Sequence, residues 1–275
     1  MKVLFSLLFF INTSFANDLI IFDIKHKQFL SAEEFLDYEA NSDSFVFGET
    51  HYHKCIQKAE AEVIQWISKD RKTEFTVGME FINYDKQAET DYWSIEYLSG
   101  AIGLRTYTEK LIGKREKDLI YAPILRETIL NNGQILGTNA PRDIKNHLIK
   151  NGYDSIPEEY KVENFVNGSR NYYQRFKKAM EGHANEEQIQ QYFLAQVYTD
   201  NYIAEKLIQK RKYPLSIQII GSFHSDYFDG VIDQLQQRGE ENITTIRFVE
   251  NKDMYSHMNP DSRYGKVSKY LIGCK

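Results

Sequence analysis

The stretch Phe45-Val-Phe-Gly-Glu-Thr-His-Tyr-His53 joins a short apolar segment to a polar one. Residues 45–47 are typical of a buried strand, and Gly48-Glu49 ends it. The residues that follow, 54–67, carry apolar side chains at the spacing of one helix face. A strand followed at once by a helix is the unit from which α/β proteins are built.

The same unit recurs along the chain. Further strands are predicted at residues 19–23, 75–79, 134–138, 215–220 and 243–249, and helices at 31–38, 84–98, 118–130, after Pro141 and at 229–238. Residues 158–211 predict helices without strands. We therefore predict an α/β fold for residues 17–275, with a mostly parallel central sheet wrapped by helices and an all-helical insertion over 158–211 before the fourth core strand.

The composition excludes several classes of protein. The chain has 275 residues, of which 42% are hydrophobic, so it can bury a core and is neither disordered nor a disulfide-stapled miniprotein. Its 34 basic and 39 acidic residues give a net charge of −5, which offers no general attraction to nucleic acid.

The first sixteen residues have the pattern of a secretory signal. Lys2 precedes an apolar run over residues 3–11, and small and polar residues follow up to Ala16. The run is much shorter than the roughly 20 residues that a spanning helix needs, so no permanent membrane span is predicted. We expect a soluble exported protein, periplasmic or secreted, that begins at Asn17.

The chain has two cysteines, Cys55 and Cys274. In an oxidising compartment they permit one disulfide. The alternative is a small apolar Cys55 on a helix and a Cys274 on a frayed tail, and the sequence does not separate the two.

Polar side chains follow four of the predicted strands. Glu49, His51 and His53 follow the first of these strands and Glu80 the second, and Asn139 and His224 follow the other two. The carboxyl ends of parallel strands meet at one edge of a sheet, where ligands bind, so we expect these residues to share a crevice. If residues 49–53 stay extended, His51 and His53 project to the same side.

A carboxylate beside imidazoles can carry out acid–base chemistry or bind a divalent metal. His-X-His is not a standard zinc spacing, so a metal-free polar cluster is the preferred interpretation of this edge. For an enzyme, the predicted catalytic residues and metal ligands are Glu49, His51, Glu80 and His224.

The helical insertion carries Asp200 between Tyr198 and Tyr202. Asp200 faces either solvent or the sheet, depending on a helix phase that the sequence leaves open. The tyrosines are either packing residues with a polar edge or an aromatic face for a planar cofactor.

Taken together, these motifs resemble the ChaN family of haem-binding uptake proteins, within the Tiki, TraB and erythromycin-esterase-like superfamily. The matching segments are residues 21–23, 29–31, 48–51, 78–80, 121–123, 138–141, Asp200 with Ala204, and 221–224 with Gly230. The chain departs from the family at Tyr52-His53, and it lacks the cysteine of a lipoprotein near residue 16.

The resemblance implies an exported protein that binds haem or another iron porphyrin through a tyrosinate-type ligand at a dimer interface and takes part in iron uptake. The residues expected to contact the cofactor are His51, His53, Tyr121, Asn139, Tyr198, Asp200 and Tyr202. The alternative function is a metal-dependent or acid–base hydrolase, of esterase or peptidase type, at the Glu/His cluster.

Overall fold

A computed structural model describes residues 19–258 and 263–275 and shows one eight-stranded mixed sheet. The strand order is β2-β1-β8-β7-β3-β6-β4-β5. Only the pairings of β1 with β2 and with β8 are antiparallel, so the predicted mostly parallel sheet is confirmed. The strands are β1 (Ile20–Asp23), β2 (Gln28–Leu30), β3 (Ser44–Glu49), β4 (Phe75–Asn83), β5 (Gly133–Asn139), β6 (Ser216–Gly221), β7 (Ile243–Glu250) and β8 (Tyr270–Cys274).

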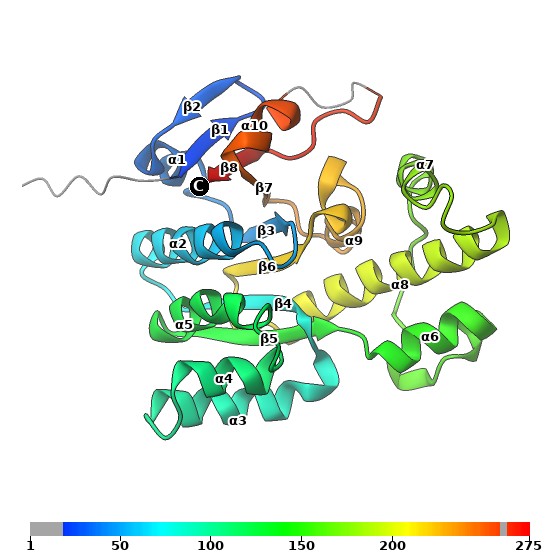
Figure 1. The fold of residues 1–275 in the computed structure, drawn as a ribbon, viewed down its shortest axis with the longest axis horizontal. Helices are drawn as coiled ribbons and strands as arrows, with labels where there is room; N and C mark the ends of the chain where they lie inside the picture. Colours follow the sequence, from blue (N-terminus) through cyan, green and yellow to red (C-terminus); the bar gives the residue numbers. More distant parts are fainter. Residues whose placement is uncertain (1–18, 259–262) are drawn as a thin grey trace, which may run out of the picture.

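Helices cover both faces of the sheet (Figure 1). The α-helices are α1 (Ala32–Tyr38), α2 (Lys54–Arg71), α3 (Gln87–Leu98), α4 (Leu104–Leu111), α5 (Ala122–Leu130), α6 (Arg142–Asn151), α7 (Arg170–Ala179), α8 (Glu186–Lys210), α9 (Val231–Gln237) and α10 (Asn251–Met258). Short 3₁₀ helices span Tyr84–Lys86, Leu119–Tyr121, Tyr153–Ser155, Glu158–Tyr160, Ser222–His224 and Asp226–Phe228.

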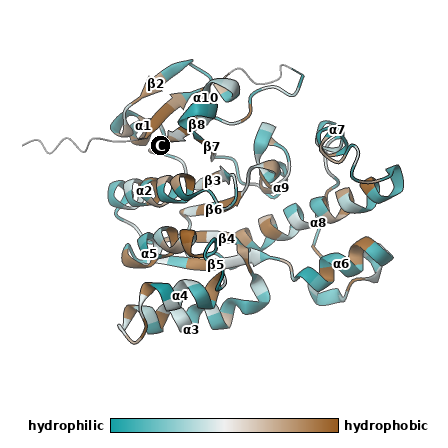
Figure 2. Ribbon diagram, viewed as in Figure 1, coloured by the Kyte–Doolittle hydropathy of each residue, from teal (hydrophilic) through white to brown (hydrophobic). Residues whose placement is uncertain are grey.

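The opening stretch shows why both faces are buried. Phe45 and Phe47 of β3 pack in the cluster that contains α2 and α5, and Val46 packs in the cluster that contains α8 and α9. Successive side chains of a strand point to opposite faces, so an unbroken apolar run suits a strand covered on both sides. Figure 2 shows many hydrophobic residues on the central strands of the sheet.

Several elements differ from the prediction. The strands β2 and β8 and the helices α4 and α10 were not predicted, and β4 continues past Glu80 to Asn83. The insertion over 158–211 is helical only in part, because residues 161–169 between a 3₁₀ helix and α7 form no helix. The helices α6, α7 and α8 lie on the side toward which the arrows of β3 and β5 point (Figure 1).

A disulfide links the last residue of β8 to the first turn of α2. Cys55, in the first turn of α2, is bonded to Cys274 of β8, with their Cα atoms 5.8 Å apart. Cys274 is therefore part of a strand between β7 and β1 and not of a frayed tail. Of the two alternatives that the sequence left open, the structure shows the bridge.

The described part of the chain has no helix with the length and apolar character needed to cross a bilayer. The predicted signal segment, residues 1–16, lies outside the described residues.

Candidate functional site

The structure brings the polar strand ends together at one edge of the sheet. The strands β3, β6, β4 and β5 are neighbours in that order, so the residues that follow them lie side by side. His51 Nε2 lies 4.0 Å from Glu80 Oε2, and His224 Nε2 lies 3.6 Å from Glu80 Oε1. Glu80 therefore stands between two imidazoles that are 173 residues apart in the chain (224 − 51).

His51 is held by the carboxylate of Glu49. The Nδ1 atom of His51 lies 2.7 Å from Glu49 Oε1, and the carboxylate is buried at the end of β3. The same carboxylate accepts hydrogen bonds from the hydroxyl of Tyr121, at 2.7 Å, and from the amide of Gln57. Tyr121 and Gln57 thus hold the Glu49 carboxylate in place, and this carboxylate orients the ring of His51.

Glu60 of α2 is a second buried acid next to this group. Neither of its carboxyl oxygens has a hydrogen-bond partner among the described residues. Burial, together with the negative charge of Glu49, raises the pKa of Glu60 well above its usual range. The raised pKa favours the uncharged form of this carboxyl group.

His224 is held in the same way from the other side of the site. Its Nδ1 atom lies 2.6 Å from Asp200 Oδ1, and Asp200 is fully buried in α8. The hydroxyl of Tyr172 donates to Asp200 Oδ2 at 2.9 Å, and Gln196 Nε2 lies 3.0 Å from His224 Nδ1. Asp200 therefore faces the sheet edge and not solvent.

Both imidazoles bind a proton more readily than an ordinary histidine. Burial alone would lower the pKa of His51, but the hydrogen bond to Glu49 and the charge of Glu80 raise it above the ordinary value. Burial would also lower the pKa of His224, and the charges of Asp200 and Glu80 raise it. Negative charge around the two rings therefore favours a cation at this edge.

Glu80 is positioned by backbone and by the neighbouring strand end. The pairing of β4 with β6 stops at Met79, and the backbone N–H of Gly221 donates to Glu80 Oε2 at 2.6 Å. Asn139 donates from its side chain to the carbonyl oxygen of Glu80 at 2.8 Å. Asn139 therefore shapes the backbone at Glu80.

Gly221 leaves the space that His51 occupies. A Cβ atom at this position would lie 2.7 Å from both Cε1 and Nε2 of the imidazole, a distance that real Cβ atoms do not adopt. The close approach of the His51 ring, and not the backbone angles of Gly221, therefore favours glycine at the end of β6.

A pocket of about 400 Å³ opens beside the two imidazoles. Its wall combines polar strand-end residues with the rings of Phe176 from α7 and Phe223, whose centroids are 6.0 Å apart. The lining residues are Glu49, Thr50, His51, Phe176, Ala179, Gln196, Gly221, Ser222, Phe223 and His224. Sequence reasoning missed Phe176, Phe223 and Gln196. Phe223 lies inside the quoted motif 221–224, which was a usable indication.

His53 does not lie beside His51, because residues 49–53 do not stay extended. Tyr52 has φ of +61°, in the left-handed region that a bulky residue seldom adopts, and this ends the extended path. His51 turns toward Glu80, whereas His53 Nδ1 lies 3.0 Å from Glu250 Oε1 at the end of β7. The two histidines therefore belong to different clusters.

The three tyrosines predicted as cofactor contacts lie inside the protein. Tyr121 is fully buried, and burial and the charge of Glu49 raise its pKa, so its phenol stays protonated. Tyr198 donates its hydroxyl to the carbonyl of Tyr160 at 2.9 Å, and its ring lies 5.8 Å from that of Tyr202. None of the three lines the pocket beside the imidazoles.

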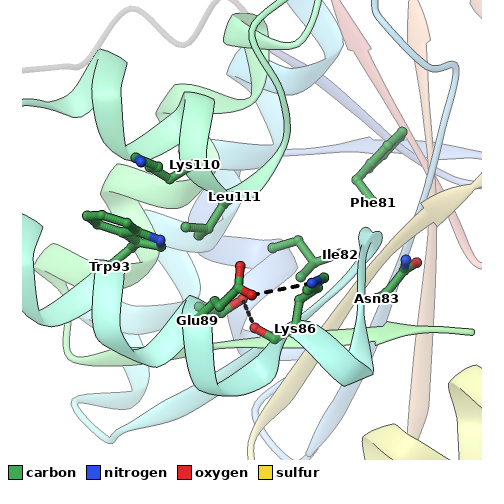
Figure 3. A pocket seen from close by; sticks show the side chains of 9 residues that line it. Phe81, Ile82, Asn83, Lys86, Glu89, Trp93, Lys110 and Leu111 are labelled. Carbon is green, nitrogen blue, oxygen red and sulfur yellow. Dashed lines mark hydrogen bonds and ion pairs between the residues drawn. The ribbon is translucent and has the colours of Figure 1, made fainter. Parts of the chain in front are cut away.

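A second, smaller pocket of about 190 Å³ lies next to α3 and α4 and contains none of the predicted site residues (Figure 3). Its charged side chains already have partners. Lys86 Nζ lies 3.3 Å from Glu89, and Lys110 Nζ lies 4.3 Å from the ring centroid of Trp93. The strand-end pocket is therefore the stronger candidate site.

Comparisons with known proteins agree with this architecture. A family model described as "Haem-binding uptake, Tiki superfamily, ChaN" matches residues 36–235. A search of curated proteins gives no match. Among solved structures, ChaN of Campylobacter jejuni superposes with a TM-score of 0.73 at 15% identity, covering 94% of this chain and 97% of that one. The type III effector HopBA1 superposes with a TM-score of 0.50 at 11% identity, covering 89% of this chain and 93% of that one. At these identities the structural matches establish the fold alone.

Proposed function

The chain belongs to the haem-binding uptake family of the Tiki superfamily, the family of ChaN, and from that premise we propose that it binds haem in the strand-end pocket. The imidazoles of His51 and His224 face the iron, and Glu49 and Asp200 hold them in position. The protein serves haem or iron uptake as an exported carrier.

One observation carries the proposal: each imidazole is oriented by a buried carboxylate. The carboxylates of Glu49 and Asp200 accept the Nδ1 proton of His51 and His224, so in the neutral form of each ring the lone pair is on Nε2. A carboxylate behind an imidazole is the usual arrangement around metal-binding histidines. Haem iron accepts such a nitrogen as an axial ligand.

The wall of the pocket suits a flat apolar ligand. Phe176 and Phe223 present aromatic rings next to the imidazoles, and Thr50, Gln196 and Ser222 supply polar atoms around them. Burial of a porphyrin face against such rings stabilises the complex by about 25 cal/mol per Å² of apolar area. The residues present therefore fit a haem.

Imidazole is the better ligand here than the tyrosinate that the resemblance implies. The described residues that line the pocket include two histidines and no tyrosine. The hydroxyl of Tyr121 donates a hydrogen bond to Glu49, and the raised pKa of Tyr121 opposes the phenolate form. We accordingly assign Tyr121 to positioning Glu49.

A dimer is suggested by the solved structure of a similar protein. The structure from Campylobacter jejuni is described as cofacial haem binding to ChaN. We propose that a second copy of the present chain covers the open face of the haem. Sedimentation should then show a dimer with haem and a smaller species without it.

An absorbance titration with hemin tests haem binding. Wild-type protein should give a Soret shift that saturates at a defined stoichiometry. His51→Ala and His224→Ala should each weaken binding and change the position of the Soret band, because each would remove a nitrogen that could bind the iron.

Tyr198→Phe is the matched control, since it removes a buried phenol outside the pocket. A Soret shift that survives both histidine changes, or that disappears in Tyr198→Phe, would contradict the proposed ligands. The absence of any saturable shift would contradict haem binding itself.

A second candidate function is a metal-dependent hydrolase, favoured by the position of Glu80 between the two Nε2 atoms. For the described residues, the group whose ligand atoms lie within 4.8 Å of one another is a different one, His53, Cys55 and Glu250. A metal at Glu80 would therefore require its ligands to draw closer. Stoichiometric metal in the purified protein, with esterase or peptidase activity lost in Glu80→Gln, would favour this alternative.

A further inference from the structure

Metal-ligating side chains gather around His53, at the C-terminal end of the motif 45–53. His53 Nδ1 lies 3.0 Å from Glu250 Oε1, and ligand atoms of His53, Cys55 and Glu250 all lie within 4.8 Å of one another. The sulfur of Cys274 is bonded to that of Cys55 and so lies next to this group. The cluster therefore contains two sulfurs, one imidazole and one carboxylate.

The fold, and not local sequence, brings these groups together. Glu250 ends β7 and Cys274 ends β8, and the two residues are direct partners in the parallel pairing of these strands. His53 is the N-cap residue of α2 and makes no side-chain capping bond, so its imidazole is available to Glu250. Cys55 lies in the first turn, where the helix dipole favours a negative sulfur.

We propose that Cys55, Cys274, His53 and Glu250 form a redox-gated site for a thiophilic divalent cation of the Zn²⁺ class. In the oxidised protein the two sulfurs are bonded to each other and the site is closed. In the reduced protein the same two sulfurs, with the imidazole and the carboxylate, form a four-ligand site.

The chemistry balances with a dithiol as the reductant. The disulfide takes up two electrons and two protons and becomes two thiols, while the dithiol is oxidised to a disulfide. The cation then binds both sulfurs and releases their two protons. Two sulfurs, a nitrogen and an oxygen are ligands that Zn²⁺ accepts in tetrahedral sites, whereas Mg²⁺ and Ca²⁺ require oxygen ligands.

A pocket opens beside the imidazole and the carboxylate of the cluster. A pocket of about 220 Å³ is lined by His53, Glu250 and Arg247, and the side chains of His53 and Glu250 are 41% and 24% exposed. Lys252 is paired with Glu250. Its ammonium group offsets part of the negative charge that two thiolates and a carboxylate would place around a divalent ion.

A disulfide that served only as a structural tie would not need His53 or Glu250. Changes at His53 and Glu250 therefore distinguish a cation site from a purely structural disulfide. The site is also independent of haem binding, because none of its four residues lines the strand-end pocket.

Titration with Co²⁺, a spectroscopic substitute for Zn²⁺, tests the site. The full chain is reduced, freed of reductant under anaerobic conditions and titrated in parallel with the oxidised chain. The reduced chain should bind one Co²⁺ with a thiolate-to-cobalt charge-transfer band and tetrahedral d–d bands, and Zn²⁺ should displace it. The oxidised chain should show neither band.

The variants identify the ligands. His53→Asn and Glu250→Gln should each lower the Co²⁺ affinity by on the order of tenfold or more, and Cys55→Ser should remove most of the charge-transfer intensity. His26→Asn is the control, because His26 is an exposed histidine paired with Asp23 in the turn between β1 and β2.

Three results would overturn the proposal. The reduced chain could give no charge-transfer band at stoichiometric Co²⁺, or His53→Asn and Glu250→Gln could bind Co²⁺ as tightly as the wild type. Circular dichroism would provide the third, if the reduced chain had unfolded and Zn²⁺ did not restore its spectrum.

Discussion

Asp200 shows how a residue outside the pocket can control it. It is fully buried in α8, holds His224 through Nδ1 and accepts a second hydrogen bond from Tyr172. Asp200→Asn keeps the shape but replaces a carboxylate oxygen by an amide, which weakens the preference for the Nδ1–H tautomer. Hemin affinity should fall by about 10- to 100-fold, as measured by absorbance titration.

Tyr172→Phe is the matched comparison for this prediction. It removes one hydrogen bond to Asp200 and leaves the contact between Asp200 and His224 in place. Its effect on hemin affinity should be clearly smaller than that of Asp200→Asn. Equal affinities for Asp200→Asn and wild type would show that Asp200 does not position His224 for the iron.

At this scale the sequence predicted that Glu49, His51, Glu80 and His224 share an edge, but it also placed His53 there and did not predict how each side chain is oriented. The phase of α8 was undetermined because residues 197–207 are buried on every side of the helix, so no apolar stripe marks one face. The divergence of His51 and His53 depends on the left-handed backbone of Tyr52, which follows from no property of tyrosine.

At the scale of elements, Glu39 joins the end of α1 to the interior strands β7 and β8. Its buried carboxylate accepts hydrogen bonds from Ser42, Thr244, Lys269 and Tyr270. Burial alone would raise the pKa of Glu39, and these hydrogen bonds outweigh it and lower the pKa below the ordinary 4.5. The stabilisation from Glu39 is therefore complete above about pH 4.5 and is lost as the pH falls through the lowered pKa.

Glu39→Gln should cost about 1–3 kcal/mol of unfolding free energy at pH 7. It should also flatten the pH dependence of that free energy below pH 4.5, as measured by urea unfolding at several pH values. Glu33→Gln, an exposed change in the same helix, is the control. If the two variants have the same pH dependence, Glu39 is not the source of the acid sensitivity.

Elements with a strong periodic pattern were predicted, and short ones that depend on their neighbours were not. The core strands of the motifs 45–49 and 215–220 are mostly apolar and buried along their whole length, and they were recognised. The strand β8 has only five residues, one of them Gly273, and it is a strand because β7 and β1 pair with it on both sides.

At the scale of the whole molecule, the bond between Cys55 and Cys274 closes a loop of 219 residues. Constraint of the unfolded chain by so long a loop stabilises the folded state by about 2–5 kcal/mol. The double variant Cys55→Ser/Cys274→Ser should lose this amount in guanidinium unfolding. The remaining stability of a domain of this kind keeps the variant folded, which the reduced cation site also requires.

Cys55→Ser alone should lose about as much stability as the double variant, because either change breaks the bond. An unchanged midpoint and slope in both variants would show that the bond contributes nothing to stability. The α/β architecture follows from the alternation of strands and helices, whereas this covalent link was left open because a spacing of 219 residues has no sequence pattern.

The long interval between the two cysteines also affects biosynthesis. At about 5–20 residues per second, a ribosome needs roughly 10–40 s to travel from codon 55 to codon 274. Until Cys274 has been added, the thiol of Cys55 has no second cysteine in the chain to pair with, and it can react with small thiols or oxidants around it. Any bond that this thiol forms in that interval must be exchanged before the native bridge can close, by attack of a thiolate on the mixed disulfide.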